Sequence, residues 1–267
     1  MLDRPSSKSQ SPLDRVFDRV KPTSAKSEFL KARNAEALYV KQLRKIARHI
    51  GDLVKGFNPL SHNDMMILQS ALRRYGLAIE PWARSTAWRM ITEVAARDKL
   101  AWGRVSAQMG FALKREIETA PTGQAMRQLL DDQVVLITSL PLEAAQRVHE
   151  LTMAGISEGS RGGNIVEEIM RTGEVTKSRA VLIARTETAR TASVLTQVRA
   201  VHVGSTHYTW STVGDSDVRP DHKALNGGVF AWNEPPIADT RTGARANPGC
   251  IYNCRCIALP IIPDDDD

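Results

Sequence analysis

The sequence THYTWSTV at Thr206–Val213 decides the fold, because it separates two regions of different character. It is rich in β-branched and aromatic residues and lies between Gly204 and Gly214, which is typical of a β-strand. Cys256–Ile262 has the same character, and Pro260 favours an edge position for it because proline cannot donate to a sheet. Gly, Pro, Asn and Asp dominate the residues between the two segments, so turns and loops rather than regular structure are predicted there.

The sequence before Gly204 has the apolar spacing of helices. Apolar residues recur every three to four positions in Ala35–Leu53, and Ser61 is predicted to cap a second helix that runs through Leu77. Further helices are predicted at Trp82–Glu118, Ala125–Leu140, Pro141 to about Met153, Asn164–Arg171, and from a cap at Thr176 to about His202. The predicted fold class is therefore mainly α with a small C-terminal β element (α+β), in which long helices precede a loop-rich, small antiparallel sheet.

Composition and length are those of a globular protein. The chain has 267 residues, of which 42% are apolar and 25% charged, and these values are ordinary for a folded domain. Aromatic residues make up only 5%, so aliphatic residues are predicted to fill the core. No apolar stretch approaches the roughly 20 residues that cross a bilayer, and the N-terminal residues lack a secretory signal. An odd cysteine count of three argues against a disulfide scaffold and predicts assembly in a cytoplasm.

Positive charge is concentrated at the start of the chain. Residues 1–50 contain twelve Lys or Arg and five acidic residues, a net +7, which leaves −1 for the rest of a chain whose total is +6. Residues 1–32 are predicted to form a flexible basic arm that contacts DNA phosphates or an acidic protein surface, or else a solvated tail. The candidate contact residues of this region are Arg15, Arg19, Lys21, Lys41, Arg44, Lys45 and Arg48. The acidic residues 263–267 are predicted to form a solubilising tail.

All three cysteines, Cys250, Cys254 and Cys256, fall within seven positions, with His222 about thirty residues upstream. Thiolate and imidazole are preferred zinc ligands, so one hypothesis is a structural zinc ion held by Cys254 and Cys256 together with Cys250 or His222. The Cys-x-Cys spacing differs from the usual CxxC zinc knuckle. The same thiols are equally explained as two small buried side chains on one face of a strand.

A second hypothesis ties the loops together without a metal. Arg219 or Arg255 would pair with an aspartate, and His222 would be hydrogen-bonded among these groups. The three candidate aspartates are Asp215, Asp217 and Asp221.

Catalysis is the least favoured interpretation of these residues. The three aspartates with His222 offer ligands for a divalent ion in a nuclease, and Cys254 with His222 offers a nucleophilic pair. The sequence shows no oxyanion-hole loop, no third residue that would orient the pair, and no phosphate-binding or dinucleotide motif. We therefore expect a protein that is not an enzyme.

A series of motifs runs from the last predicted helix to Cys256. Its members are Arg179-Ala180, Ile183-Ala184-Arg185-Thr186-Glu187, Trp210-Ser211-Thr212, Asp215, Asp217, Val218-Arg219-Pro220, His222, Leu225-Asn226-Gly227, Phe230, Pro248-Gly249 and Cys254-Arg255-Cys256. The ordered set covers about 120 residues and resembles the phage head morphogenesis domain named after the minor head protein F of phage Mu. The predicted helices from about Val135 are similar to those that precede this domain in the family.

The resemblance implies three regions: the arm 1–32, a helical N-terminal region 33–134 and a Mu F-like domain 135–267. Within that domain, helices are expected over 135–204, a loop and strand module over 205–262 and the acidic tail over 263–267. It implies a minor capsid protein that acts in procapsid assembly near the portal vertex, with a portal, major capsid or scaffold protein and non-specific double-stranded DNA as partners, and no membrane. Its expected location is the host cytoplasm during assembly and then the virion, in the capsid interior or at the portal vertex.

The alternative functions are a zinc-stabilised nucleic-acid-binding protein and a metal-dependent nuclease or toxin-like enzyme. On the Mu F-like interpretation, Trp210–Cys256 is a rigid docking module whose loops are held by Arg219, His222 and Arg255. Glu187 is expected to pair with Arg185 and Arg190 on its own helix or to reach the loop arginines.

Overall fold

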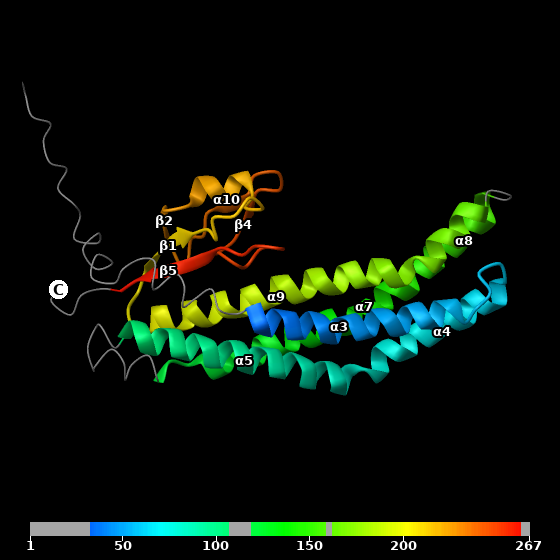
Figure 1. Ribbon diagram of the computed structural model, residues 1–267, viewed down its shortest axis with the longest axis horizontal. Helices are drawn as coiled ribbons and strands as arrows, with labels where there is room; N and C mark the ends of the chain where they lie inside the picture. Colours follow the sequence, from blue (N-terminus) through cyan, green and yellow to red (C-terminus); the bar gives the residue numbers. More distant parts are fainter. Residues whose placement is uncertain (1–32, 107–118, 159–161, 263–267) are drawn as a thin grey trace, which may run out of the picture. The chain divides into compact units, whose positions relative to one another are not determined.

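A computed structural model of the chain describes residues 33–106, 119–158 and 162–262 (Figure 1). The predicted basic arm, residues 107–118 of the predicted third helix and the acidic tail lie outside the described residues. The described residues form two compact units. The helical unit contains residues 33–95, 123–158 and 162–191, and the mixed unit contains residues 96–106, 119–122 and 192–262.

Helices account for most of the described chain, followed by a small antiparallel sheet, so the predicted fold class is confirmed. None of the described helices combines the length and apolar composition that crossing a bilayer requires. The helices are α3 (Arg33–Lys55), α4 (His62–Ala78), α5 (Glu80–Ser106), α7 (Thr122–Glu158), α8 (Gly162–Met170), α9 (Thr172–His202) and the short α10 (Pro220–Leu225).

The first two helices follow from local sequence signals. The buried residues Tyr39, Leu43 and Ile50 of α3 recur at the three-to-four spacing of one helix face. Ser61 caps α4 as predicted, because its side chain accepts a hydrogen bond from the backbone N–H of Asp64.

Two predicted helix starts are wrong. Pro141 lies inside α7 and does not open a new helix. Proline removes one backbone N–H from the helix, and the burial of Leu140 and Ala144 on either side offsets that loss. Thr176 does not cap α9, which begins four residues earlier, and its hydroxyl donates to the carbonyl of Thr172 within the first turn.

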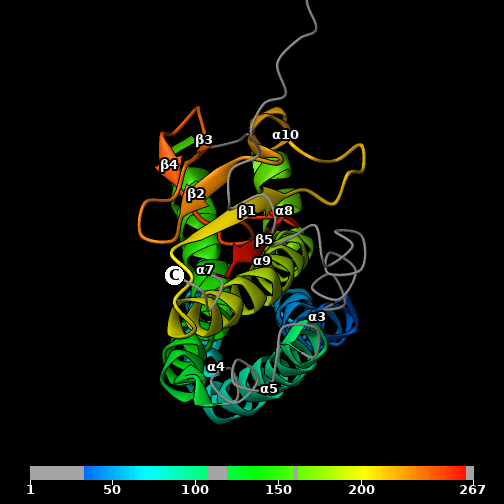
Figure 2. The same cartoon turned by 90° about the vertical axis from the view of Figure 1, so that its left-hand side faces the viewer.

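The sheet of the mixed unit has the order β2-β1-β5, with antiparallel pairs (Figure 2). Its central strand β1 (His207–Ser211) pairs with β2 (Val229–Ala231) and β5 (Ile257–Ile261). Pro260 is therefore on an edge strand, as predicted. The segment predicted as turns and loops also holds α10, β2 and a hairpin of β3 (Ile237–Asp239) and β4 (Ala244–Arg245), which corrects that prediction.

The two units have different cores. Leu, Ile, Val, Met and Ala dominate the buried residues of the helical unit, as the composition predicts. Most of the buried aromatic residues lie instead in the mixed unit, where the rings of Tyr208 and Trp232 have centroids 4.5 Å apart. The aromatic core of this unit, which also contains Trp102 and Trp210, was not predicted from composition.

Two glycines of the helical unit that lie close together are expected to tolerate replacement by alanine differently. A Cβ at Gly173 would lie 2.8 Å from the Gly51 Cα, whereas a Cβ at Gly51 would meet Gly173 at an ordinary 3.6 Å. We expect Gly173→Ala to lower the free energy of unfolding by about 1–3 kcal/mol through overpacking against backbone. The matched control Gly51→Ala should leave stability unchanged or slightly higher, because alanine favours helix. Urea denaturation of both variants measures this, and equal losses would contradict the structure.

Candidate metal centre and the loops around it

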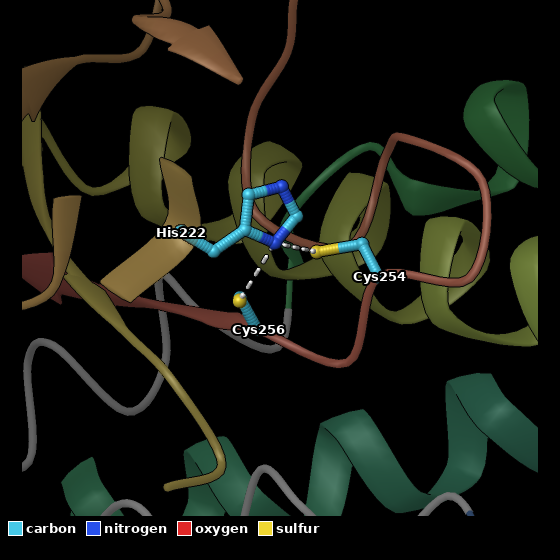
Figure 3. Close-up of side chains that lie close together, drawn as sticks. All are labelled: His222, Cys254 and Cys256. Atoms are coloured by element: carbon cyan, nitrogen blue, oxygen red, sulfur yellow. Dashed lines mark hydrogen bonds between the residues drawn. The ribbon is translucent and has the colours of Figure 1, made fainter. Parts of the chain in front are cut away.

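Three side chains of the mixed unit converge in its core (Figure 3). Nδ1 of His222 lies 3.5 Å from the Cys256 sulfur and 3.7 Å from the Cys254 sulfur. One ligand atom from each residue lies within 4.8 Å of the other two, and all three residues are at least 95% buried. This cluster has the donor types and the spacing to hold a metal ion.

Three separate parts of the chain supply these side chains. His222 stands in the first turn of α10, which Pro220 opens at a position where proline suits a helix. Cys254 follows a loop in which Gly249 and Asn253 adopt left-handed backbone, with φ of 82° and 53°. Cys256 immediately precedes β5, so an extended segment presents both sulfurs inward and leaves Arg255 exposed between them.

Hydrogen bonds define the state of the imidazole. Nε2 of His222 lies 3.1 Å from the carbonyl oxygen of Ala238 in β3. A carbonyl can only accept, so Nε2 carries the proton, and in the neutral ring Nδ1 presents a lone pair to the thiols. Trp210 covers the ring edge-on at a centroid distance of 5.4 Å and excludes water from it.

The two thiols are electrostatically unequal. The Cys256 thiol donates to the Cys254 sulfur, and this contact lowers the pKa of Cys254 and raises that of Cys256. The backbone N–H of Gly249, 3.3 Å from the Cys254 sulfur, lowers the pKa of Cys254 further. Negative charge in the pair is thus placed on Cys254.

Cys250 does not join the cluster, so its predicted use as a ligand is corrected. Its thiol donates to the Ser193 hydroxyl at 3.4 Å, on α9. Of the two alternative partners predicted for Cys254 and Cys256, the structure brings His222 to them and not Cys250.

The structure forms one of the two predicted arginine–aspartate ties. Arg255 contacts both oxygens of Asp215, at 2.7 and 2.9 Å, and lies 3.5 Å from Asp217. Arg219 does not pair with an aspartate: it donates to the carbonyl of Tyr252 at 2.9 Å and stacks 4.3 Å above that ring. His222 is not hydrogen-bonded among these groups either, since its partners are the two thiols and a backbone carbonyl.

The remaining motif residues shape the backbone near the cluster. Gly227 has a φ of 82°, which glycine adopts readily, and its N–H donates to the carbonyl of Trp210. Asn226 accepts from the backbone N–H of Thr212 and so ties the same turn to the end of β1. Pro248 and Gly249 are buried in the loop before Cys254.

A second ion pair near the surface, between Asp239 and Arg241, was not predicted from the sequence. Asp239 of β3 is 2% exposed and accepts from Arg241 at 2.9 Å and from the Tyr252 hydroxyl at 2.6 Å. Hydrogen bonds from Arg241, and then from Tyr252, lower the pKa of Asp239. The only signal in the sequence was an acidic residue two positions before an arginine, which is too common to single out.

Glu187 belongs to the helical unit, where it is nearly buried. Its carboxylate accepts from Gln133 at 2.6 Å and from Arg190 at 3.2 Å, so the structure forms the local pair with Arg190. Arg185 pairs with Glu36 instead. The Tyr39 hydroxyl extends this hydrogen-bond network by donating to the Gln133 side chain at 2.7 Å. Neither Gln133 nor Tyr39 was predicted from the sequence to lie in the surroundings of Glu187.

The two catalytic interpretations gain little from these positions. Asp215 and Asp217 are exposed beside Arg255, while Asp221 accepts from Thr240, so the aspartates and His222 form no shared ion site. Cys254 and His222 do lie together, but both are buried.

The basic residues predicted to contact DNA or a partner are only partly described. Lys41, Arg44, Lys45 and Arg48 are exposed on α3, and Arg15, Arg19 and Lys21 lie outside the described residues.

The fold and the cluster define a helical protein with a C-terminal sheet module closed around a buried His-Cys-Cys core. Residues 146–259, less than half of the chain, match the family described as Phage Mu protein F like protein. This match confirms the predicted resemblance to Mu F-like head morphogenesis proteins.

A curated relative extends the similarity. An uncharacterized protein of Haemophilus influenzae is 29% identical over 160 residues, which cover 60% of this chain and 34% of the relative. The matched region thus spans about a third of the length of that relative. No solved structure gives a significant match to the chain.

The Asp239 tie predicts a pH dependence of stability. Its pKa is lowered in the folded state, below the ~3.9 of a free aspartate. The tie therefore stabilises fully above about pH 4, and this stabilisation is lost as the pH falls towards the folded pKa. We expect Asp239→Asn to be less stable than wild type near neutral pH, with a difference that shrinks in acid. Urea denaturation across this range measures it, with Asp217→Asn as the exposed control. A difference independent of pH would contradict the assignment.

Proposed function

We propose that this chain is a minor capsid protein that acts in phage head morphogenesis, during procapsid assembly near the portal vertex. The observation that carries the proposal is the family match over residues 146–259, which includes the whole His222, Cys254 and Cys256 cluster. The proposed location is the host cytoplasm during assembly and then the virion, in the capsid interior or at the portal vertex.

The geometry of the mixed unit supports a docking role without catalysis. The side chains of His222, Cys254 and Cys256 are buried and bonded to one another, which leaves this cluster out of reach of a substrate. Buried contacts and surface ties fix the loops between β1 and β5 in one shape. A fixed surface of this kind binds a portal, major capsid or scaffold protein at a lower entropic cost than mobile loops would.

A basic helix face supports contact with packaged DNA. Lys41, Arg44, Lys45 and Arg48 are exposed on α3, and none of them forms an ion pair with another described residue. Phosphates attract such a face without sequence preference. The same face also fits the alternative function of a zinc-stabilised nucleic-acid-binding protein, which predicts DNA binding without any capsid association.

The assembly role predicts a stable complex with the portal protein of the same phage or prophage. Co-expression and affinity purification should recover both proteins together, and deletion of the gene should reduce the yield of filled heads. Recovery of the chain alone, with normal heads from the deletion phage, would contradict the proposal.

The nuclease alternative is tested separately. Incubation of the protein with plasmid and single-stranded DNA in Mg²⁺, Mn²⁺ or Zn²⁺ is expected to leave the DNA intact.

The α3 face predicts salt-dependent DNA affinity. Replacing Lys41, Arg44, Lys45 and Arg48 by alanine should weaken binding, and the slope of log K against log salt should fall by about 0.9 for each lost phosphate contact. The matched control replaces four other exposed arginines, Arg73, Arg74, Arg89 and Arg127. Fluorescence anisotropy with a labelled duplex measures both variants. An equal loss in both would show that net charge, and not this face, determines binding.

A further inference from the structure

We propose that the mixed unit binds one Zn²⁺ ion through Nδ1 of His222 and the sulfurs of Cys254 and Cys256. The placement of these side chains and of the backbone groups around them supports such a site whether or not the chain acts in head assembly.

The nitrogen–sulfur separations are those of a tetrahedral zinc site. Zinc binds sulfur at about 2.3 Å and imidazole nitrogen at about 2.0–2.1 Å, so the tetrahedral angle places a nitrogen and a sulfur ligand about 3.6 Å apart. The two observed nitrogen–sulfur distances are 3.5 and 3.7 Å. The two sulfurs lie within 4.8 Å of each other, so all three donor atoms are close enough to converge on one ion.

The groups around the three side chains are those expected of metal ligands. The Ala238 carbonyl holds the Nε2 proton of His222, and this leaves Nδ1 free of a proton and aimed at the sulfurs. The Gly249 N–H donates to the Cys254 sulfur, which stabilises a thiolate. Both supporting groups belong to the backbone, so side-chain substitutions nearby leave them in place.

An ion satisfies the cluster better than hydrogen bonds alone. The Nδ1 lone pair can accept from one thiol at a time, and thiols are weak donors. Without an ion, the buried cluster is held only by weak thiol contacts, one between the two sulfurs and one to Nδ1. With an ion, all three donor atoms are used at once, and α10 is joined to the segment that precedes β5.

The part of the chain that the structure describes supplies three ligands and no fourth. Within the described ranges, no other His, Cys, Asp or Glu places a ligand atom in this group, and the Cys250 thiol is directed to Ser193. The fourth position of the ion is therefore taken by water or a small anion.

Metal analysis of the full-length chain tests the site. Protein purified from zinc-containing medium without chelators should carry one zinc per chain by mass spectrometry. Cys254→Ser, Cys256→Ser and His222→Ala should each lower zinc affinity by more than about 100-fold. Replacing a residue that only hydrogen-bonds to a metal ligand typically costs ~10–100-fold. The matched control Cys250→Ser removes a neighbouring thiol and should retain the ion. Loss of zinc from Cys250→Ser equal to that from Cys254→Ser would overturn this ligand set.

Wild-type protein alone provides a second measurement, because substitutions at buried positions also lower stability. After removal of metal with a chelator, Co²⁺ should produce thiolate-to-metal charge-transfer absorption, and Zn²⁺ should raise the melting temperature while Mg²⁺ does not. Wild-type protein that contains no zinc, gives no cobalt–thiolate absorption and melts at the same temperature with Zn²⁺ would overturn the proposal. Neither result bears on the portal complex, which is measured separately.

Discussion

The mixed unit depends on the requirement that one buried imidazole find partners for both of its nitrogens. Nε2 of His222 is satisfied by the backbone of β3, and Nδ1 faces the two thiols that precede β5. One side chain on a six-residue helix thereby fixes two segments that lie 16 and 32 or more positions further along the chain. An unsatisfied polar group in such a core costs roughly 1–3 kcal/mol, so displacing any of these segments is unfavourable.

Surface contacts contribute differently. The Arg255–Asp215 pair has favourable bidentate geometry, but both side chains are about 40% exposed, and exposed ion pairs contribute at most about 1 kcal/mol. The Arg219–Tyr252 stack is similarly at the surface. These contacts select one loop conformation among several of similar energy. Burial of the aromatic rings, the thiols and His222 supplies most of the stability.

Local signals and tertiary contacts differ in how far the sequence reveals them. The Ser61 cap and the α3 spacing depend on residues within one or two turns, and both were predictable. Pro141 was misread because the cost of proline in a helix is local, while the burial that offsets it is not. For the cluster, spacing named the cysteines and His222 but could not separate His222 from Cys250. That choice is made by the left-handed residues Gly249 and Asn253, which turn the chain between Cys250 and Cys254.

Two buried charged residues of the matched segment 146–259 contact residues that lie before it in the sequence. The segment begins at residue 146, inside α7, and contains Glu187 and Arg199. Glu187 relies on Gln133, and Arg199 forms a buried pair with Asp98 at 2.7 Å, so both partners precede the segment. Burial alone raises the pKa of Asp98, which shows that this carboxylate is costly to bury without its arginine. A chain reduced to the matched segment would bury Arg199 without its carboxylate and would leave Glu187 with Arg190 as its partner. The helices before residue 146 therefore supply buried partners for Glu187 and Arg199 that the matched segment does not contain.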